Sequence, residues 1–125
     1  MMVILGTVIV VVDPYFHYHK PLKCLAYQLY NERYQNDGIV KHFDYDAIIT
    51  GTSMTQNFKT SEMDTLFGTN AIKVPFAGGE YKEVKDNLER AISANPNLKT
   101  IVWGLDLNRI NGDVNAIKFD SYPSY

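Results

Sequence analysis

A short apolar run that stops abruptly at a glycine constrains the fold of this chain more than any other feature. Within Tyr45–Thr55 (YDAIITGTSMT), Ala47–Ile49 has the length and β-branched character of a buried parallel strand. Gly51 lets the backbone turn sharply where this strand ends, and the small polar cluster Thr52–Thr55 follows. Ligands and catalytic groups gather at the carboxyl ends of strands in open α/β sheets, so Ser53 is the first candidate functional residue.

Two further segments predict strands that end in the same way. Asn70–Phe76 is followed by the tight loop Ala77–Gly79, and Thr100–Leu105 is followed by Asp106–Arg109. Helices are expected between the strands, and this βαβαβ order predicts an α/β fold with a parallel sheet. Only three strands precede Tyr125, so we expect the N-terminal portion of a larger domain that is incomplete at the C-terminus.

The helix predictions rest on the spacing of apolar residues and on stop signals. Glu80–Ala94 is amphipathic, with charged side chains on the face opposite its apolar side chains. A shorter helix is expected to end at Gly68. Apolar residues also follow Pro21 at helical spacing and predict a short amphipathic helix. The polar segment Asn31–Gly38 ends in the turn signal Asp37-Gly38, and Ile39–Asp44 then leads into the first strand.

The N-terminal segment Met1–Val12 carries no charged side chain. Twelve helical residues span about 18 Å, well short of the roughly 30 Å hydrocarbon core of a membrane. We interpret the segment as part of an N-terminal membrane anchor or signal segment; a buried β-strand is the alternative that its Val and Ile content favours. The anchor is preferred because Asp13-Pro14 ends the run and Tyr15, Phe16 and Tyr18 suit a membrane–water boundary.

Composition sets limits on the rest of the chain. With 125 residues, the chain has room for one domain, expected over residues 13–125. Lys and Arg number 12 against 14 Asp and Glu, so the net charge of -2 argues against a nucleic-acid partner. Of nine tyrosines, five fall within Tyr15–Tyr34. Interior packing is the favoured interpretation of that density, and a carbohydrate- or partner-facing surface is the alternative.

Cysteine and histidine usage gives little support for a metal or redox site. Cys24 is the single cysteine, so an internal disulfide and a zinc site built on cysteine pairs are excluded, and we expect it to be buried. His17 and His19 are two residues apart and share a direction in an extended segment, a geometry able to bind a metal. No acidic or Cys partner lies at a useful spacing, so polar surface is the favoured interpretation, and no cofactor or metal is predicted.

The three loops after the strands should lie on one edge of a parallel sheet. Acyl transfer needs a hydroxyl nucleophile and donors for the oxyanion. Ser53 is the candidate nucleophile, and its N–H with that of Gly78 or Gly79 supplies donors. Asn108 is the candidate amide donor, and Asp106 gives polar support. Each loop also has a purely structural alternative as a turn, and the joint placement of the loops favours function.

These loops carry a resemblance to a known family. GTSMT resembles the first motif (Gly-Asp-Ser-x-x) of the SGNH/GDSL hydrolase superfamily, the glycine loop resembles its second motif, and GLDLN its third. The chain is similar, over most of Asp13–Tyr125, to uncharacterised membrane-anchored members from bacterial surface-polysaccharide gene clusters. The resemblance implies a flavodoxin-like three-layer αβα sandwich. It also implies ester hydrolysis or O-acyl transfer on an acylated glycan of the cell envelope, by a membrane-anchored domain outside the cytoplasm.

Two departures from the family pattern are visible. Thr52 stands where the first motif has Asp, and no histidine follows Ser53, so the C-terminal Asp-x-x-His that supplies the base is absent. His42 precedes the strand that carries Ser53 and should lie at the opposite edge of the sheet. The chain is therefore interpreted as a fragment of an esterase or O-acyltransferase, or as a non-working enzyme.

Two other functions remain open from the sequence. The first is a non-catalytic glycan- or partner-binding module of an envelope assembly, which uses the tyrosine-rich surface. The second, weaker one is an anion site at the helix that begins near Glu80, through the amides of Gly78 and Gly79. The absence of a nearby Lys or Arg at that loop argues against the anion site.

Overall fold

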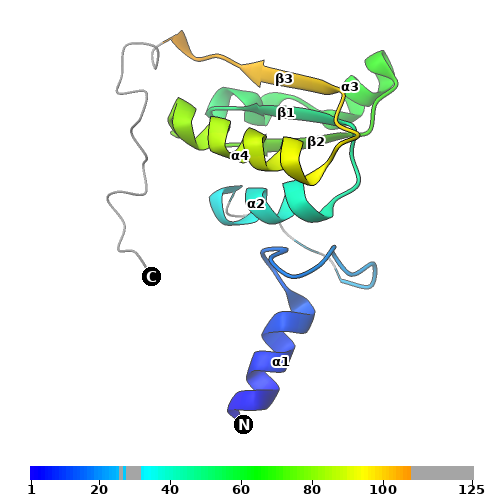
Figure 1. Cartoon of the computed structure of the whole chain (residues 1–125), viewed down its shortest axis with the longest axis vertical. Coiled ribbons are helices and arrows are strands. Elements are labelled where there is room, and N and C mark those ends of the chain that lie inside the picture. Colours follow the sequence, from blue (N-terminus) through cyan, green and yellow to red (C-terminus); the bar gives the residue numbers. More distant parts are fainter. Residues whose placement is uncertain (26, 28–31, 108–125) are drawn as a thin grey trace.

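The computed structural model describes residues 1–25, 27 and 32–107, and Asn108 and the residues after it lie outside this part of the chain. The elements follow one another as shown in Figure 1. In chain order they are α1 (Met2–Val12), α2 (Glu32–His42), β1 (Ala47–Gly51), the 3-10 helix η1 (Ser53–Asn57), α3 (Thr60–Phe67), β2 (Ala71–Pro75), α4 (Tyr81–Ala94) and β3 (Thr100–Gly104).

The three strands form a parallel sheet in the order β2-β1-β3. β1 is central and every one of its residues is buried. At its carboxyl end, Gly51 is in register with Pro75 of β2 and with Gly104 of β3. The predicted α/β fold with a parallel sheet is confirmed. This order places the loops after β1 and β3 next to each other at the point where the chain changes direction across the sheet, which is where α/β proteins bind ligands.

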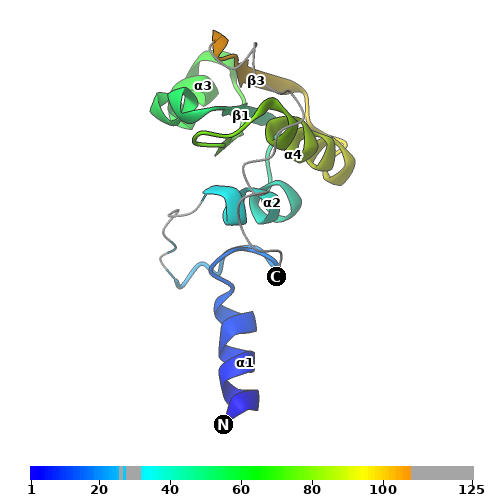
Figure 2. The ribbon, with the colours of Figure 1, turned by 90° about the vertical axis from the view of Figure 1, so that its left-hand side faces the viewer.

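Helices cover both faces of the sheet. Successive side chains of a strand point to opposite faces, so the strands contribute apolar side chains to two separate clusters. Ile48 and Val74 pack with Val84 in the cluster under α2 and α4. Ile49 packs with Met63 of α3 on the other face. Figures 1 and 2 show α3 on one side of the strands and α4 on the other. Each fully buried aliphatic side chain contributes about 1.5–3 kcal/mol to folding, so these two clusters hold the three layers together.

α2 corrects one prediction, since the segment interpreted as a turn, Asn31–Gly38, contributes all of its described residues to this helix. Gly38 is needed for close packing rather than for a turn. A Cβ at this position would lie 2.4 Å from the carbonyl oxygen of Phe16. Asn36 is buried, and its amide donates a hydrogen bond of 2.6 Å to the carbonyl oxygen of Pro75. The polar pattern therefore belongs to a helix whose buried face bonds to neighbouring backbone.

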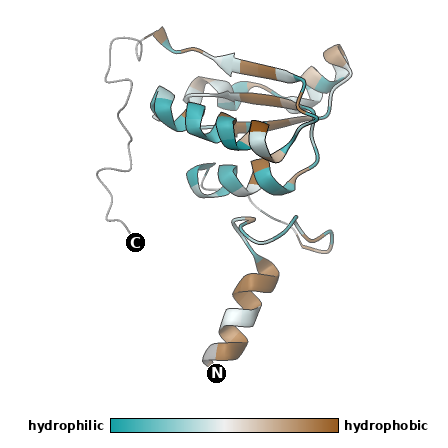
Figure 3. Cartoon of the chain, viewed as in Figure 1, coloured by the Kyte–Doolittle hydropathy of each residue, from teal (hydrophilic) through white to brown (hydrophobic). Residues whose placement is uncertain are grey.

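The N-terminal segment is helical, so the alternative of a buried β-strand is wrong. The apolar side chains described in α1 are exposed. Figure 3 shows most of this helix in brown, the colour of hydrophobic residues. None of the helices in the described part of the chain combines the length and the apolar character needed to cross a membrane.

The buried carboxylate of Asp13 closes the end of α1. Asp13 adopts a left-handed conformation with φ of 40°. Its two carboxylate oxygens accept the backbone N–H groups of His17, Tyr18 and His19 at 2.9, 2.8 and 3.1 Å. Burial opposes ionisation of Asp13, but these three N–H donors outweigh burial and hold the pKa of the carboxyl below its ordinary value. The residues after α1 are thereby fixed in one conformation.

His19 has a carbonyl oxygen opposite each ring nitrogen. Nδ1 lies 2.6 Å from the carbonyl oxygen of Lys20, and Nε2 lies 3.1 Å from that of Val10. Carbonyl oxygens only accept hydrogen bonds, so both contacts are satisfied together only by the doubly protonated imidazolium. Both contacts favour the protonated form of His19 at the C-terminal end of α1, where the helix dipole also favours a positive charge.

We expect the pKa of His19 to be above its ordinary value in the folded protein. The carbonyl of Lys20 raises this pKa most, and the carbonyl of Val10 and the charge of Asp13 raise it further against the effect of burial. A raised folded-state pKa means that the stabilisation is complete below the unfolded-state pKa and is lost as the pH rises through the folded-state pKa. An NMR titration of the imidazole measures this value, and His19→Asn should remove the corresponding pH dependence of amide exchange at the end of α1. A His19 that titrates at or below the ordinary value would contradict the assignment.

Several side chains that were expected to be buried are exposed. Tyr15, Tyr18 and Tyr34 are exposed, whereas Tyr27 packs against the buried ring of Phe16 at 5.2 Å. Interior packing is therefore wrong for three of the tyrosines in this stretch, and Tyr30 lies outside the described residues. Cys24, expected to be buried, is also exposed.

Candidate functional site

Two glycines and a threonine build the carboxyl end of the central strand. Gly51 has φ of 146°, which side-chain-bearing residues rarely adopt. A Cβ on Gly51 would lie 2.6 Å from the carbonyl oxygen of Gly104 and 2.7 Å from Cγ2 of Thr55. A Cβ on Gly104 would lie 2.3 Å from the same methyl group. Both strands therefore end in glycine because the buried Thr55 fills the space between them.

Ser53 is the first residue of η1, one residue after the buried Thr52. The hydroxyl of Thr55 donates to the carbonyl oxygen of Thr52 at 2.7 Å and so fixes the turn. Ser53 is exposed, and its hydroxyl has no hydrogen-bond partner among the described residues. As the first residue of a helix, it also has a backbone N–H without an intrahelical acceptor. The turn is thus stabilised by Thr55, and Ser53 is an exposed residue of this turn.

A hollow of about 620 Å³ lies between the segments after β1 and β3. Thr52 and Met54, the two neighbours of Ser53, both line it, so Ser53 lies at its margin although it is not itself a lining residue. Phe58 and Leu105 contribute apolar surface from the two segments. The hollow occupies the switch point of the sheet, the position at which the fold itself favours a ligand.

Asp106 lies on the same hollow as the neighbours of Ser53. Its carbonyl oxygen accepts a hydrogen bond of 2.7 Å from the hydroxyl of Tyr81, the first residue of α4. The ring of Tyr81 also meets Trp103 of β3 with 6.0 Å between ring centroids. These contacts hold the start of the loop after β3 beside α4. Asn108, the predicted amide donor, lies outside the described residues.

Gly78 and Gly79 follow β2 and do not line this hollow. The N–H of Gly79 donates to the carbonyl oxygen of Phe76 at 2.8 Å, and Gly78 has φ of 60°, so both glycines serve a tight turn. The structure places Asp106 and the neighbours of Ser53 around one hollow and leaves the glycine pair outside it. In this conformation the amide of Gly79 is occupied within its own turn.

The N-terminus of α4 is also occupied by its own side chains. Glu80 and Glu83 form a capping box, and the carboxylate of Glu83 accepts the N–H of Glu80 at 3.1 Å. An anion at this position would meet two carboxylates and an N–H that already has a partner. The geometry therefore argues against the anion site considered at Gly78 and Gly79.

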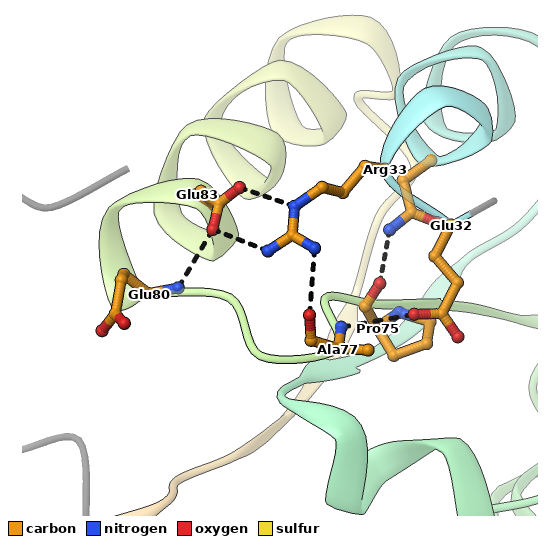
Figure 4. A network of polar contacts seen from close by, with 7 residues as sticks. Glu32, Arg33, Pro75, Ala77, Glu80 and Glu83 are labelled. Carbon is orange, nitrogen blue, oxygen red and sulfur yellow. Dashed lines mark hydrogen bonds and ion pairs between the residues drawn. The ribbon is translucent and has the colours of Figure 1, made fainter. Parts of the chain in front are cut away.

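A buried ion pair clamps the loop after β2 between α2 and α4 (Figure 4). Arg33 donates through Nε and Nη2 to the two oxygens of Glu83 at 3.0 and 3.1 Å. Its Nη1 donates to the carbonyl oxygen of Ala77 at 2.9 Å, and Glu32 accepts the N–H of Ala77 at 3.3 Å. The side chains of Arg33 and Glu83 are only 15% and 5% exposed. Sequence reasoning missed this cluster, since it did not predict α2 and the two charges are 50 residues apart.

The three histidines lie away from Ser53 along the sheet. His42 ends α2 before β1 begins, and its Nε2 lies 3.3 Å from the carbonyl oxygen of His17. His19 contacts the end of α1. The length of a five-residue strand, about 16 Å, separates the start of β1 from its carboxyl end. None of these side chains is placed to take a proton from Ser53.

Comparisons with family models, with curated proteins and with solved structures found no match to this chain. The fold and the site define it as an α/β protein with a parallel sheet and an exposed serine beside a hollow at the switch point. Because many functions share such folds, a function has to be argued from the site itself.

Proposed function

We propose that the chain carries the nucleophile of an SGNH-like serine esterase or O-acyltransferase. The observation that carries the proposal is the placement of Ser53, with an exposed hydroxyl directly after the central strand and at the margin of the hollow. A nucleophile in this position reaches a substrate held between the loops after β1 and β3. Acyl transfer to a serine hydroxyl is the chemistry that such a placement serves best.

The oxyanion that forms in this reaction requires preorganised donors. The backbone N–H of Ser53 is one, since the first N–H of a helix has no intrahelical acceptor. Asn108, as an amide, and Gly78, through its N–H, remain the candidates for the others, with Asp106 as polar support. Gly79 serves only if its turn opens, because its N–H is bonded to Phe76.

The proposed reaction requires a general base, and no histidine follows Ser53 in this sequence. A serine hydroxyl is a weak nucleophile without an adjacent base. His17, His19 and His42 lie toward the other end of the sheet, so the proposal requires a histidine from additional chain or from a partner. In its absence, the chain is expected to react slowly.

The proposed substrate is an acylated glycan or another ester of the bacterial cell envelope. The exposed apolar surface of α1 suits attachment to a membrane and so supports a membrane-attached protein. Placement of the domain outside the cytoplasm is part of the proposal. Tyr15 and Tyr18 lie just after α1. This position suits them to a membrane–water interface, where tyrosine side chains are enriched. The net charge of -2 favours neither a nucleic acid nor a strongly acidic partner.

The test is covalent labelling with a fluorophosphonate probe. We expect slow labelling of this chain and faster labelling of any longer product of the same gene that includes a base. Ser53→Ala should abolish labelling in both. Ser61→Ala is the matched control, since Ser61 is also an exposed serine but lies on α3, and it should leave labelling unchanged. Labelling that persists in Ser53→Ala would reject the proposal.

A non-catalytic binding module is the second candidate, and one observation favours it. Tyr15 contacts Tyr34 and His17 with ring centroids 5.9 and 6.0 Å apart, and the two tyrosines are exposed. Exposed aromatic rings suit a glycan or a protein partner. Glycan binding that is lost in Tyr15→Ala and kept in Ser53→Ala, without fluorophosphonate labelling, would favour this function over the esterase.

A further inference from the structure

We propose that the hollow beside Ser53 binds the acyl group of the ester, and that this group is an apolar alkyl chain rather than an acetyl. This inference rests on the proposed function and specifies its substrate class. It assigns the apolar part of the substrate to the space between the loops after β1 and β3. The glycan or alcohol part is then left on the solvent side of Ser53.

The chemistry of the lining supports an alkyl occupant. Met54 and Phe58 come from the segment after β1, and Leu105 and Leu107 from the segment after β3. All four are more than half exposed, with Met54 and Leu105 each at 66%. Apolar side chains that converge from two loops on one concave surface gain free energy when an apolar ligand removes them from water.

The polar groups of the hollow are few. The hydroxyl of Thr55 is used in the turn, and that of Thr52 is buried without a hydrogen-bond partner among the described residues, so it is a single polar atom in a mainly apolar lining. Asn57 and Asp106 are the remaining polar side chains of the lining. A sugar ring in this space would leave most of its hydroxyls without partners, which is costly, whereas an alkyl chain has none to satisfy. The hollow therefore fits the acyl part of an ester better than the glycan part.

The position of the hollow also fits an acyl group. Thr52 and Met54 line it and flank Ser53 in the chain, so an ester whose carbonyl lies beside Ser53 has the hollow next to it for its alkyl chain. The volume of about 620 Å³ exceeds what an acetyl group fills. Each methylene that enters the hollow should tighten binding about fourfold, the factor that corresponds to about 0.8 kcal/mol per buried CH₂.

The test is binding of methyl butanoate, hexanoate and octanoate, followed by NMR of methyl-labelled protein. We expect the dissociation constant to fall about fourfold per methylene, with the largest shifts at Met54, Leu105 and Leu107. Leu105→Ser should weaken octanoate binding. Leu66→Ser, at a 76% exposed leucine of α3 outside the hollow, should not. Equal affinity at all chain lengths, or shifts confined to α1, would overturn the proposal.

The outcome separates this inference from the proposed function. Ser53→Ala should lose fluorophosphonate labelling but keep the fall of the dissociation constant with chain length, since that dependence comes from the hollow. Fluorophosphonate labelling at Ser53 without chain-length dependence would overturn the acyl site alone. Chain-length dependence without labelling, even in a longer gene product that includes a base, would reject the esterase and with it the assignment of the occupant as an acyl group.

Discussion

Arg33→Met is expected to lower the free energy of unfolding by about 3–5 kcal/mol, the cost of leaving one partner of a buried ion pair without its countercharge. Glu83 is nearly buried, and it would lose both bonds from the guanidinium. The carbonyl oxygen of Ala77 would lose its donor as well. Urea denaturation measures the change as a shift of the midpoint.

A surface ion pair of the same helix provides the control. Lys85 pairs with Glu89 on the solvent-facing side of α4, where both side chains are more than half exposed. Lys85→Met should cost about 0–1 kcal/mol, because water screens this pair. Adding Glu83→Gln to Arg33→Met should recover part of the loss, since the neutral amide needs no countercharge and still accepts the N–H of Glu80. Equal losses in the free energy of unfolding for Arg33→Met and Lys85→Met would show that the buried ion pair stabilises the fold no more than an exposed one.

Gly51→Ala is the substitution with the second large expected effect. It should lower the free energy of unfolding by about 2–6 kcal/mol, from backbone strain and overpacking together. The new Cβ would lie 2.6 Å from the carbonyl oxygen of Gly104 and would need φ of 146°. Relief requires β1 and β3 to separate, which would also open the hollow. Thermal or urea unfolding measures the loss.

Gly68→Ala is the matched control for this substitution. Gly68 also has a positive φ, of 64°, but nothing lies within 4 Å of a Cβ at that position. Only the left-handed conformation is penalised there, at about 1–2 kcal/mol. If Gly51→Ala lowers the free energy of unfolding by no more than Gly68→Ala does, that result would contradict a close approach of β1 to β3 at Gly51.

The sheet and its long helix could be predicted from the sequence because their signals are local. β1 and β3 are short apolar runs that stop at Gly51 and Gly104, and α4 shows a clear amphipathic period. Their βαβαβ order was enough to predict parallel pairing, and with it the common edge that carries Ser53 and Asp106. Parallel pairing therefore predicts the common edge, whereas the spatial order β2-β1-β3, which leaves Gly78 and Gly79 outside the hollow, was not predicted.

α2 could not be predicted because the reasons for its sequence lie in other elements. Asn36 is buried to bond Pro75, and Gly38 makes room for the backbone of Tyr15 and Phe16. In sequence, these residues look like a turn, since polar residues and glycine are typical of turns. The hydrogen bond from the N–H of Gly79 to the carbonyl oxygen of Phe76 could not be predicted either, because it depends on the conformation of one tight turn.

Peptide mapping of the fluorophosphonate adduct by mass spectrometry tests the central claim most directly. The serine hydroxyl that follows the central strand should carry the adduct, and the exposed serine of α3, Ser61, should remain unmodified. An adduct at Ser53 that is absent after Ser53→Ala is the predicted result. An adduct on another residue would contradict the account. So would the absence of any adduct in a longer product of the same gene that includes a general base.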